Sequence, residues 1–180
     1  MSRTITVIGA TGHLGRLAVE ALLERGVAPS DIRATGRATE RLADLADRGV
    51  QVLRVDRDDE AAVADAVRGA ASVLLVSGTE PGRVEQHRRV VEAAREAGVE
   101  QLVYTSGPPA RGSSVRLLAD HAATEELLET SGVPHTVLRN AWYVENYTGQ
   151  VETYRAHGMV GSAGEGRVSL APRREYAEAA

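Results

Sequence analysis

Several amino acids with distinctive chemistry are missing from this chain of 180 residues. It contains no Cys, which excludes disulfides, thiol catalysis and cysteine-ligated zinc or iron–sulfur sites. All 21 basic residues are Arg, so the chain has no Lys either. This excludes Schiff-base chemistry, the phosphate-binding lysine of P-loops and every Tyr–Lys catalytic pair.

Aromatic residues and long apolar runs are also scarce. The chain has no Phe, and its 5 Tyr and 1 Trp all lie at or after Tyr104. Apolar runs such as residues 73–76 are far shorter than the ~20 residues of a membrane-spanning helix. The N-terminus leads into a strand-like run without the apolar core of a signal peptide. We therefore expect a cytoplasmic protein.

The length and charge are typical of one globular domain. A hydrophobic content of 43% and a charged content of 26% argue against disorder. The net charge of −4 indicates no basic surface of the kind that binds nucleic acid or an anionic membrane. We expect a small-molecule substrate and no direct nucleic-acid or membrane partner.

Short apolar runs alternate with segments of helical periodicity. The pattern predicts strands at residues 4–8, 32–35, 50–55, 72–76, 101–105 and 136–139. It predicts helices at residues 13–25, 39–48, 60–68, 81–97 and 116–130, and the first turns of another helix at 172–180. Apolar strands joined by helices favour an α/β fold, a Rossmann-like doubly wound parallel sheet with helices on both faces. We assign residues 1–140 to this nucleotide-binding domain, and residues 141–180 to a small, incomplete substrate lobe of the same domain.

Three glycines follow the first strand in the sequence Gly9-Ala10-Thr11-Gly12-His13-Leu14-Gly15. The first permits a tight turn, the second lets a pyrophosphate approach the backbone, and the third allows close packing of helix on strand. The helix that begins here directs free N–H groups and its positive dipole end at phosphates. We therefore expect a dinucleotide to be bound by Gly9, Thr11, Gly12, His13, Leu14 and Gly15. The alternative is a glycine-rich turn that binds nothing.

The end of the second strand indicates which dinucleotide is bound. A carboxylate there would bind the ribose 2′-hydroxyl of NAD, whereas an Arg accommodates the 2′-phosphate of NADP. The strand ends at Arg37, with Arg41 one helical turn later, while Asp31 precedes the strand. This favours NADP(H) over NAD(H). The alternative is that Arg37 is a solvated residue at the start of a helix.

Further polar residues follow the third, fourth and fifth strands, at the edge where ligands of open α/β sheets collect. Asp56 is placed to accept the adenine amino group, with a turn or helix-cap role as the alternative. Ser77 and Gly78 follow the fourth strand, and Ser106 follows the fifth. We expect Asp56, Ser77 and Gly78 to contact the cofactor.

The chain resembles the atypical, NmrA-like branch of the short-chain dehydrogenase/reductase superfamily, and is most similar there to the type-two NAD(P)H:quinone oxidoreductases. The resemblance runs from residue 4 to the end of the chain, through the glycine loop and residues 35–37, 74–78, 104–106, 121–125 and 138–147. It implies an NADPH-dependent reductase that transfers a hydride to a quinone or similar electron-poor acceptor, with Asn140 at the nicotinamide carboxamide. Members of this branch continue well beyond this length, so we expect a truncated C-terminal lobe.

One departure from the superfamily concerns its proton relay. Typical members use a Ser and a Tyr-x-x-x-Lys, in which Tyr is the general acid and Lys lowers its pKa. Ser106 fits the Ser position, but Leu117 stands at the Tyr position and His121 at the Lys position. Quinone reduction can dispense with the relay, because the proton can come from water or a weak acid. We expect His121 and Ser106 to be catalytic, with a half-buried structural role as the alternative for His121.

The aromatic residues lie beyond the nucleotide-binding half. We expect Tyr104, Trp142, Tyr143 and Tyr147 to contact substrate, the last three by offset stacking on a flat quinone. The alternative is that these rings form the core of a loop-rich lobe. His135 and His157 lack metal-ligand spacing, so we expect no metal.

Three functions are compatible with these features. The first is an NADPH-dependent quinone reductase, and the second is an NADP(H)-binding sensor without turnover, as in the NmrA regulators. The third is an incomplete, inactive NAD(P)-binding domain. Residues 140–147 favour the first, because they lie on the substrate side that a sensor need not keep. The sequence does not fix the oligomeric state, and a homodimer is the one assembly that we consider.

Overall fold

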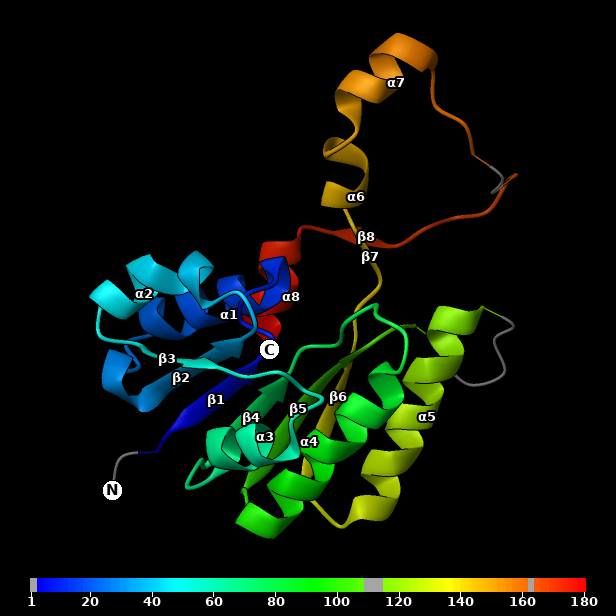
Figure 1. Cartoon of the computed structure of the whole chain (residues 1–180). Coiled ribbons are helices and arrows are strands. Elements are labelled where there is room, and N and C mark those ends of the chain that lie inside the picture. The colour runs from blue at the N-terminus through cyan, green and yellow to red at the C-terminus, as the bar shows by residue number, and fades with distance from the viewer. Residues whose placement is uncertain (1–2, 109–114, 162–163) are drawn as a thin grey trace.

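The computed structural model describes residues 3–108, 115–161 and 164–180 (Figure 1). Within these ranges a sheet of 6 parallel strands has the order β3-β2-β1-β4-β5-β6. The strands are β1 (Ile5–Ile8), β2 (Ile32–Gly36), β3 (Gln51–Arg54), β4 (Ser72–Leu75), β5 (Gln101–Ser106) and β6 (His135–Arg139). The expected doubly wound, Rossmann-like sheet is confirmed. Its strand order reverses between β1 and β4, and ligands of such sheets bind at that point.

Helices cover both faces of the sheet. One layer contains α1 (His13–Glu24), α2 (Ala43–Asp47) and α8 (Arg173–Ala179). The other contains α3 (Glu60–Val67), α4 (Arg83–Ala97) and α5 (Arg116–Ser131) (Figure 1). The two layers bury separate apolar cores against the central strands, so the carboxyl edge of the sheet is held from both sides.

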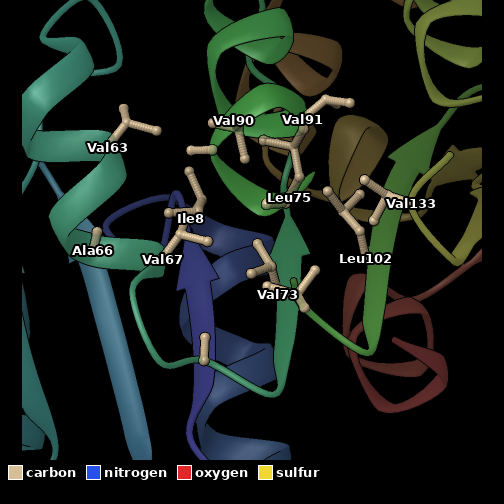
Figure 2. Close-up of a cluster of buried hydrophobic side chains, with 14 of the residues drawn as sticks. Ile8, Val63, Ala66, Val67, Val73, Leu75, Val90, Val91, Leu102 and Val133 are labelled. Carbon is tan, nitrogen blue, oxygen red and sulfur yellow. The ribbon is translucent and has the colours of Figure 1, made fainter. Parts of the chain in front are cut away.

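The strands supply both cores because successive side chains point to opposite faces. Val7 and Leu74 pack under the α1 layer, whereas their neighbours Ile8 and Leu75 pack under the α3–α5 layer. Figure 2 shows Ile8 and Leu75 meeting Val90 of α4 in the second core. Full burial of each such side chain stabilises the fold by about 1.5–3 kcal/mol.

Two helices differ from the sequence pattern. The single helix expected at residues 39–48 is a 3-10 turn, η2 (Thr39–Leu42), followed by the short α2. Leu42 at the end of η2 and Leu45 in α2 are both fully buried, so both elements pack an apolar side chain onto the sheet. The helix expected from residue 81 begins at Arg83, because Gly82 takes the left-handed φ of +80°. A further 3-10 turn, η1 (Pro29–Asp31), precedes β2.

The C-terminal segment leaves the sheet and then returns to it. β7 (Trp142–Tyr143) pairs in parallel with β8 (Leu170–Ala171), and α6 (Glu145–Thr148) and α7 (Val151–His157) project from this pair (Figure 1). α8 confirms the helix expected at residues 172–180, and it packs beside α1. Ala177 is 3% exposed in that contact. This return places Arg173 and the neighbouring β7 at the edge of the nucleotide-binding core.

Candidate cofactor and substrate site

The glycine loop has the shape that its spacing predicts. Gly9 directly follows β1 and has a left-handed φ of +95°, and its N–H donates to Thr35 O at 3.2 Å. A Cβ at Gly12 would meet Gly9 O at an ordinary 3.4 Å, so the backbone at Gly12 is not crowded. At Gly15 a Cβ would lie 2.3 Å from Gly9 O. The start of α1 therefore packs directly on the loop, and only glycine fits at Gly15.

Gly36 is a fourth glycine that this region requires. A Cβ there would lie 2.3 Å from Thr11 Oγ1, because the Thr11 side chain covers the end of β2. This contact fixes the glycine loop against the residue directly before Arg37. The sequence motif assigns Gly36 no role, although a glycine at the end of a strand beside a candidate phosphate ligand was a usable signal.

A cleft of about 470 Å³ lies over the carboxyl ends of β1, β2, β3 and β4. Most of the predicted cofactor residues line it, namely Gly9, Thr11, Gly12, His13, Leu14, Arg37, Asp56, Ser77 and Gly78. Gly15 supports the loop from behind, and Asn140 lies outside the lining. The fold therefore brings together residues from loops that are up to about 70 positions apart in the chain, as expected at the switch point of such a sheet.

Arginine side chains from several elements reach this cleft. Arg37 and Arg41 line it, and Arg37 Nη2 donates to Glu80 Oε1 at 3.0 Å. Arg57 is more enclosed. Its Nη1 is buried and has no hydrogen-bond partner among the described residues, and burial lowers its pKa. Sequence analysis missed Arg57, because nothing within the run 56–59 separates it from an ordinary turn residue.

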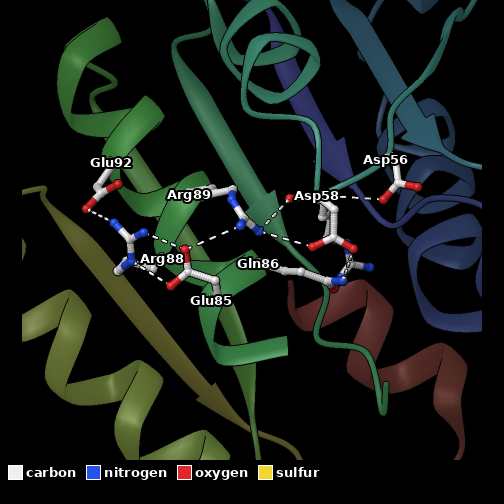
Figure 3. Close-up of polar contacts among 8 residues, drawn as sticks. Asp56, Asp58, Glu85, Gln86, Arg88, Arg89 and Glu92 are labelled. Atoms are coloured by element: carbon white, nitrogen blue, oxygen red, sulfur yellow. Dashed lines mark hydrogen bonds and ion pairs between the residues drawn. The ribbon is translucent and has the colours of Figure 1, made fainter. Parts of the chain in front are cut away.

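The loop that carries Asp56 and Arg57 is fixed by α4 (Figure 3). Asp58 accepts hydrogen bonds from Gln86 Nε2 at 3.0 Å and from Arg89 Nη1 at 3.1 Å, and its own N–H donates to Asp56 Oδ1 at 3.1 Å. The cap of α3 is Asp59, whose carboxylate accepts from the first helical turn at 3.0 Å. Asp56 is therefore not the helix cap, but the hydrogen bond that its Oδ1 accepts from the Asp58 N–H supports the turn role of the same alternative. Asp56 is exposed and lines the cleft, and its contact with adenine stays a prediction.

His121 of α5 forms a buried pair with Tyr104 of β5. Tyr104 Oη lies 2.7 Å from His121 Nδ1, and the two residues are 0% and 6% exposed. Burial lowers the pKa of His121 to about 4 and raises that of Tyr104 to about 12. At neutral pH the imidazole is therefore uncharged. A Tyr104 hydroxyl that donates to Nδ1 leaves the imidazole proton on Nε2.

This pair changes two expectations. Tyr104 has no exposed surface, so the expected direct contact with substrate is wrong. Its hydroxyl instead orients His121. A neutral His121 with a pKa of about 4 can donate a hydrogen bond from Nε2, but it carries no extra proton for transfer at neutral pH.

Ser106 belongs to a buried polar group at the end of β5. Its Oγ donates to Glu125 Oε1 at 2.6 Å, and Arg139 donates to the same carboxylate at 3.1 and 2.6 Å. Ser106 is 4% exposed, and the Glu125 side chain is 2% exposed. Because its single hydroxyl proton is engaged by Glu125, Ser106 can meet a ligand only as an acceptor in this geometry.

The aromatic residues after β6 form two separate pairs rather than one platform. Tyr143 lines the cleft and packs edge-on against Tyr176 at 5.3 Å between ring centres. Trp142, which is 48% exposed, lies outside the cleft lining, and its ring centre is 6.5 Å from that of Tyr147. Asn140 Nδ2 donates to Tyr143 Oη at 3.3 Å. The expected stacking surface is therefore divided, and Tyr143 is its member at the cleft.

The described residues were compared with the requirements of a metal site and of a membrane-spanning helix. Within residues 3–108, 115–161 and 164–180, no group of three or more His, Asp or Glu side chains is arranged to hold a metal ion. None of the helices in those same ranges combines the length and apolarity needed to cross a bilayer.

A family model described as NAD(P)H-binding matches residues 9–171. The chain belongs to this NAD(P)H-binding family. It is 41% identical to quinone oxidoreductase 2 of Escherichia coli over 178 residues, which are 98% of the chain and 62% of that relative. It is 29% identical to an NmrA-like family domain-containing oxidoreductase of Aspergillus flavus, over 95% of the chain and 58% of the relative.

Solved structures of similar proteins superpose closely on this NAD(P)H-binding chain. Triphenylmethane reductase of Citrobacter sp., complexed with NADP(H), matches with a TM-score of 0.90 and 36% identity, over 98% of the chain and 63% of that protein. NADPH-dependent quinone oxidoreductase of Escherichia coli, complexed with NADPH, matches with a TM-score of 0.90 and 40% identity, over 97% and 62%. The resemblance to NmrA-like quinone reductases is confirmed, and the chain spans less than two thirds of these relatives' length.

The cleft fits the dinucleotide that the family name implies. The loop at Gly9 and Gly12 exposes backbone rather than side chains, and α1 begins there with N–H groups that lack helical partners. Arg37 supplies a guanidinium at the mouth, and Arg57 supplies a buried N–H that has no partner in the described residues. Buried polar groups are rarely left unpaired, so an anionic ligand would satisfy this donor.

Proposed function

We propose that this chain forms the nucleotide-binding part of an NADPH-dependent reductase that transfers a hydride to a quinone or a similar electron-poor acceptor. The observation that carries the proposal is the 41% identity to quinone oxidoreductase 2, which extends over 98% of the chain and so includes the loop, the cleft and residues 140–147. The NADPH complexes of two similar reductases support the same cofactor.

In this proposal each group around the cleft holds one part of the cofactor. The Gly12 N–H donates to Gly9 O at 3.1 Å, so in this proposal the backbone N–H groups of His13 and Leu14, in the first turn of α1, bind the pyrophosphate. Arg37 binds the 2′-phosphate, which a guanidinium holds with two parallel bonds. Asp56 accepts from the adenine amino group. Ser77 and Gly78 line the cleft and contact the cofactor, and Asn140 contacts the carboxamide with the amide proton that Tyr143 leaves free.

NADPH, when bound, supplies a hydride that passes directly to an electron-poor ring. The residues of this chain orient the reactants and need not relay a proton. His121 lies outside the cleft lining, and its neutral imidazole is held in place by the hydrogen bond with Tyr104. The proton for the reduced acceptor comes from water, which agrees with a site that has neither the catalytic Tyr nor the Lys of typical superfamily members.

Residues 141–180 contribute the start of a substrate lobe in this proposal. Tyr143 presents its ring at the cleft, with the Arg173 guanidinium 4.9 Å from the ring centre. A flat conjugated acceptor would stack beside this pair by offset packing. Trp142 and Tyr147 lie further out, and their contact with substrate stays a prediction, as does a homodimer.

Titration with NADPH and NADH, followed by addition of menadione, tests the proposed function. We expect tighter binding of NADPH than of NADH, and oxidation of NADPH once the quinone is added.

Arg37→Gln should weaken NADPH binding by about tenfold and NADH binding little, because it removes a charge-assisted pair to phosphate. Arg48→Gln, an exposed change outside the cleft lining, serves as the control. Comparable affinity for NADP⁺ and NADPH, without oxidation by a panel of quinones, would indicate a sensor instead.

A further inference from the structure

The cleft holds an acidic side chain among its arginines. Glu80 lies in the loop between β4 and α4, and its Oε1 accepts a hydrogen bond from Arg37 Nη2 at 3.0 Å. Its Oε2 accepts from the Thr79 backbone N–H at 3.0 Å, which orients the carboxylate. The side chains of Arg37 and Glu80 are 60% and 44% exposed, so a ligand that enters the cleft can reach this ion pair.

Arg57 lies beside the same carboxylate. A Cβ built at Gly78 would be 2.1 Å from Glu80 Oε2 and 3.5 Å from Arg57 Nη1, so the two side chains are neighbours over Gly78. Arg57 Nη1 nevertheless has no hydrogen-bond partner among the described residues. Glu80 stays ionised, because the hydrogen bond from its own backbone N–H, and then the charges of Arg57 and Arg37, lower its pKa.

A carboxylate between two guanidinium groups has the surroundings of a bound anion. A 2′-phosphate at Arg37 needs the donors that Glu80 now uses, because a phosphate binds a guanidinium best through two parallel bonds. The phosphate would also lie close to the Glu80 charge and be repelled by it. The carboxylate and the phosphate are therefore alternatives at Arg37.

We infer that Glu80 is an internal competitor of the cofactor's 2′-phosphate, and that it limits the preference of this chain for NADP(H) over NAD(H). Glu80 holds Arg37 while the cleft is free and releases it when NADP(H) binds. The inference rests on the proposed function, since it takes Arg37 as the ligand of the 2′-phosphate.

The two dinucleotides respond differently to such a competitor. NADP(H) must separate Arg37 from Glu80, whereas NAD(H) has a hydroxyl at the same position and leaves the ion pair in place. A carboxylate also accepts a hydrogen bond from a ribose 2′-hydroxyl, as the acidic residue at the end of β2 does in NAD-specific proteins. Glu80 therefore weakens NADP(H) binding and leaves NAD(H) binding unchanged or stronger.

Glu80→Gln tests this inference, because it keeps the shape of the side chain and removes its charge. Calorimetric titration of the 180-residue chain with NADP⁺ and NAD⁺ should show NADP⁺ binding about threefold to fivefold tighter, the range expected for release of an exposed ion pair. NAD⁺ affinity should stay the same or fall. In an Arg37→Gln background the gain in NADP⁺ affinity from the Glu80 substitution should be clearly smaller, because the partner that both anions share is gone and only the repulsion between Glu80 and the phosphate remains to be relieved.

Glu40→Gln is the matched control. Glu40 is exposed on η2, three residues beyond Arg37 and outside the cleft lining. The substitution Glu40→Gln therefore removes one negative charge, as Glu80→Gln does, but leaves the ion pair between Arg37 and Glu80 intact. Its effect on the two nucleotides should be equal within about twofold. Thermal denaturation verifies that each variant is folded.

Unchanged or weaker NADP⁺ binding by Glu80→Gln would overturn the inference, and so would an equal gain in Glu40→Gln. These results leave the proposed function standing, provided that the unmodified chain binds NADPH and oxidises it with quinones. Binding without oxidation by quinones would reject the proposed reductase, while the Glu80 comparison would still decide the competition. A chain that binds neither dinucleotide would overturn both.

Discussion

The cofactor cleft is defined by two kinds of residue. Glycines allow the backbone segments of the loop to pack closely, and charged side chains line the cleft beside them. Gly15 and Gly36 each face another part of the loop at a distance that no Cβ can occupy. Arg37, Arg57 and Glu80 then supply the charges that an anionic ligand meets. The glycine spacing was visible in the sequence, because each step of the loop depends on its immediate neighbours. The grouping of the charges was not, since it joins three separate loops.

Gly15→Ala should disrupt the loop, because its new methyl group would lie 2.3 Å from Gly9 O, a backbone atom that cannot turn away. We expect the free energy of unfolding to fall by about 2 kcal/mol or more, with loss of NADP⁺ binding. Urea denaturation and calorimetric titration measure the two effects. Gly161→Ala, where a Cβ meets nothing within 4 Å, should change stability by only about 0.5 kcal/mol. Equal effects of the two substitutions would contradict the proposed crowding at Gly15.

At the scale of helices and strands, one buried side chain joins three elements beside the cleft. Arg83, at the start of α4, is 2% exposed. It donates to Asp120 Oδ2 at 2.9 Å and to Gly78 O at 2.7 Å, and also to the Leu117 carbonyl. The planar guanidinium serves α5 and the loop after β4 at once, so Arg83 holds the loop that carries Glu80 against the helix that carries His121.

Arg83→Lys should destabilise this junction, because an ammonium group cannot replace the fork that meets three acceptors in one plane. The expected loss in the free energy of unfolding is about 2 kcal/mol, of which part reflects carbonyl groups left without a donor. Arg88→Lys on the same helix provides the comparison. The Arg88 side chain is 40% exposed and forms ion pairs with Glu85 and Glu92 of the same helix, so we expect a loss of about 0.5 kcal/mol or less. A similar loss in both variants would argue against the junction.

For the molecule as a whole, two buried histidines link stability to pH. His87 and His121 are 0% and 6% exposed, and burial lowers their pKa values to about 3 and about 4. Their unfolded values are about 6.5. Between these limits the unfolded chain binds protons that the folded chain excludes. The contribution of the two neutral histidines to the free energy of unfolding is therefore fully present above about pH 6.5, and it is lost as the pH falls towards about 4.

Lowering the pH from about 7 to about 5 should reduce the free energy of unfolding by about 2 kcal/mol per buried histidine, or about 4 kcal/mol together. Urea denaturation at the two pH values measures the loss. His121→Asn should remove roughly half of the pH-dependent part, because one of two titrating rings is gone. His157→Gln, an exposed change at the end of α7, should leave it intact. Stability that is equal at both pH values would show that these rings titrate normally in the folded chain.

Much of the fold followed from the sequence because its signals are short-ranged. Apolar runs predicted the strands of the sheet, and helical periodicity predicted α1, α3, α4 and α5 to within about two residues at most boundaries. The prediction failed at residues 39–48, where the 3-10 turn η2 precedes α2 and each of the two packs one buried leucine, Leu42 or Leu45, onto the sheet. Periodicity marks which side chains are buried, but the local helix type depends on the surface that receives them.

The candidate site divides in the same way. Residues of the glycine loop and the strand ends were predicted from the sequence, because parallel strands bring their carboxyl ends to one edge. Tyr104 was misplaced, since a strand residue becomes fully buried only when α5 covers it. Trp142 and Tyr143 are sequence neighbours, yet they face different surroundings, because α8 returns to pack Tyr176 on the latter.

The sequence by itself determined the parallel sheet, the dinucleotide loop and the exclusion of thiol, lysine and Schiff-base chemistry, because these depend on composition, alternation and the sterics of adjacent residues. Only the tertiary structure decided that His121 is neutral, that Ser106 is bound to Glu125 and that Glu80 occupies Arg37. Each of these depends on burial or on a partner that is at least about 15 residues distant in the chain. Such contacts exist only after the helices have packed on the sheet.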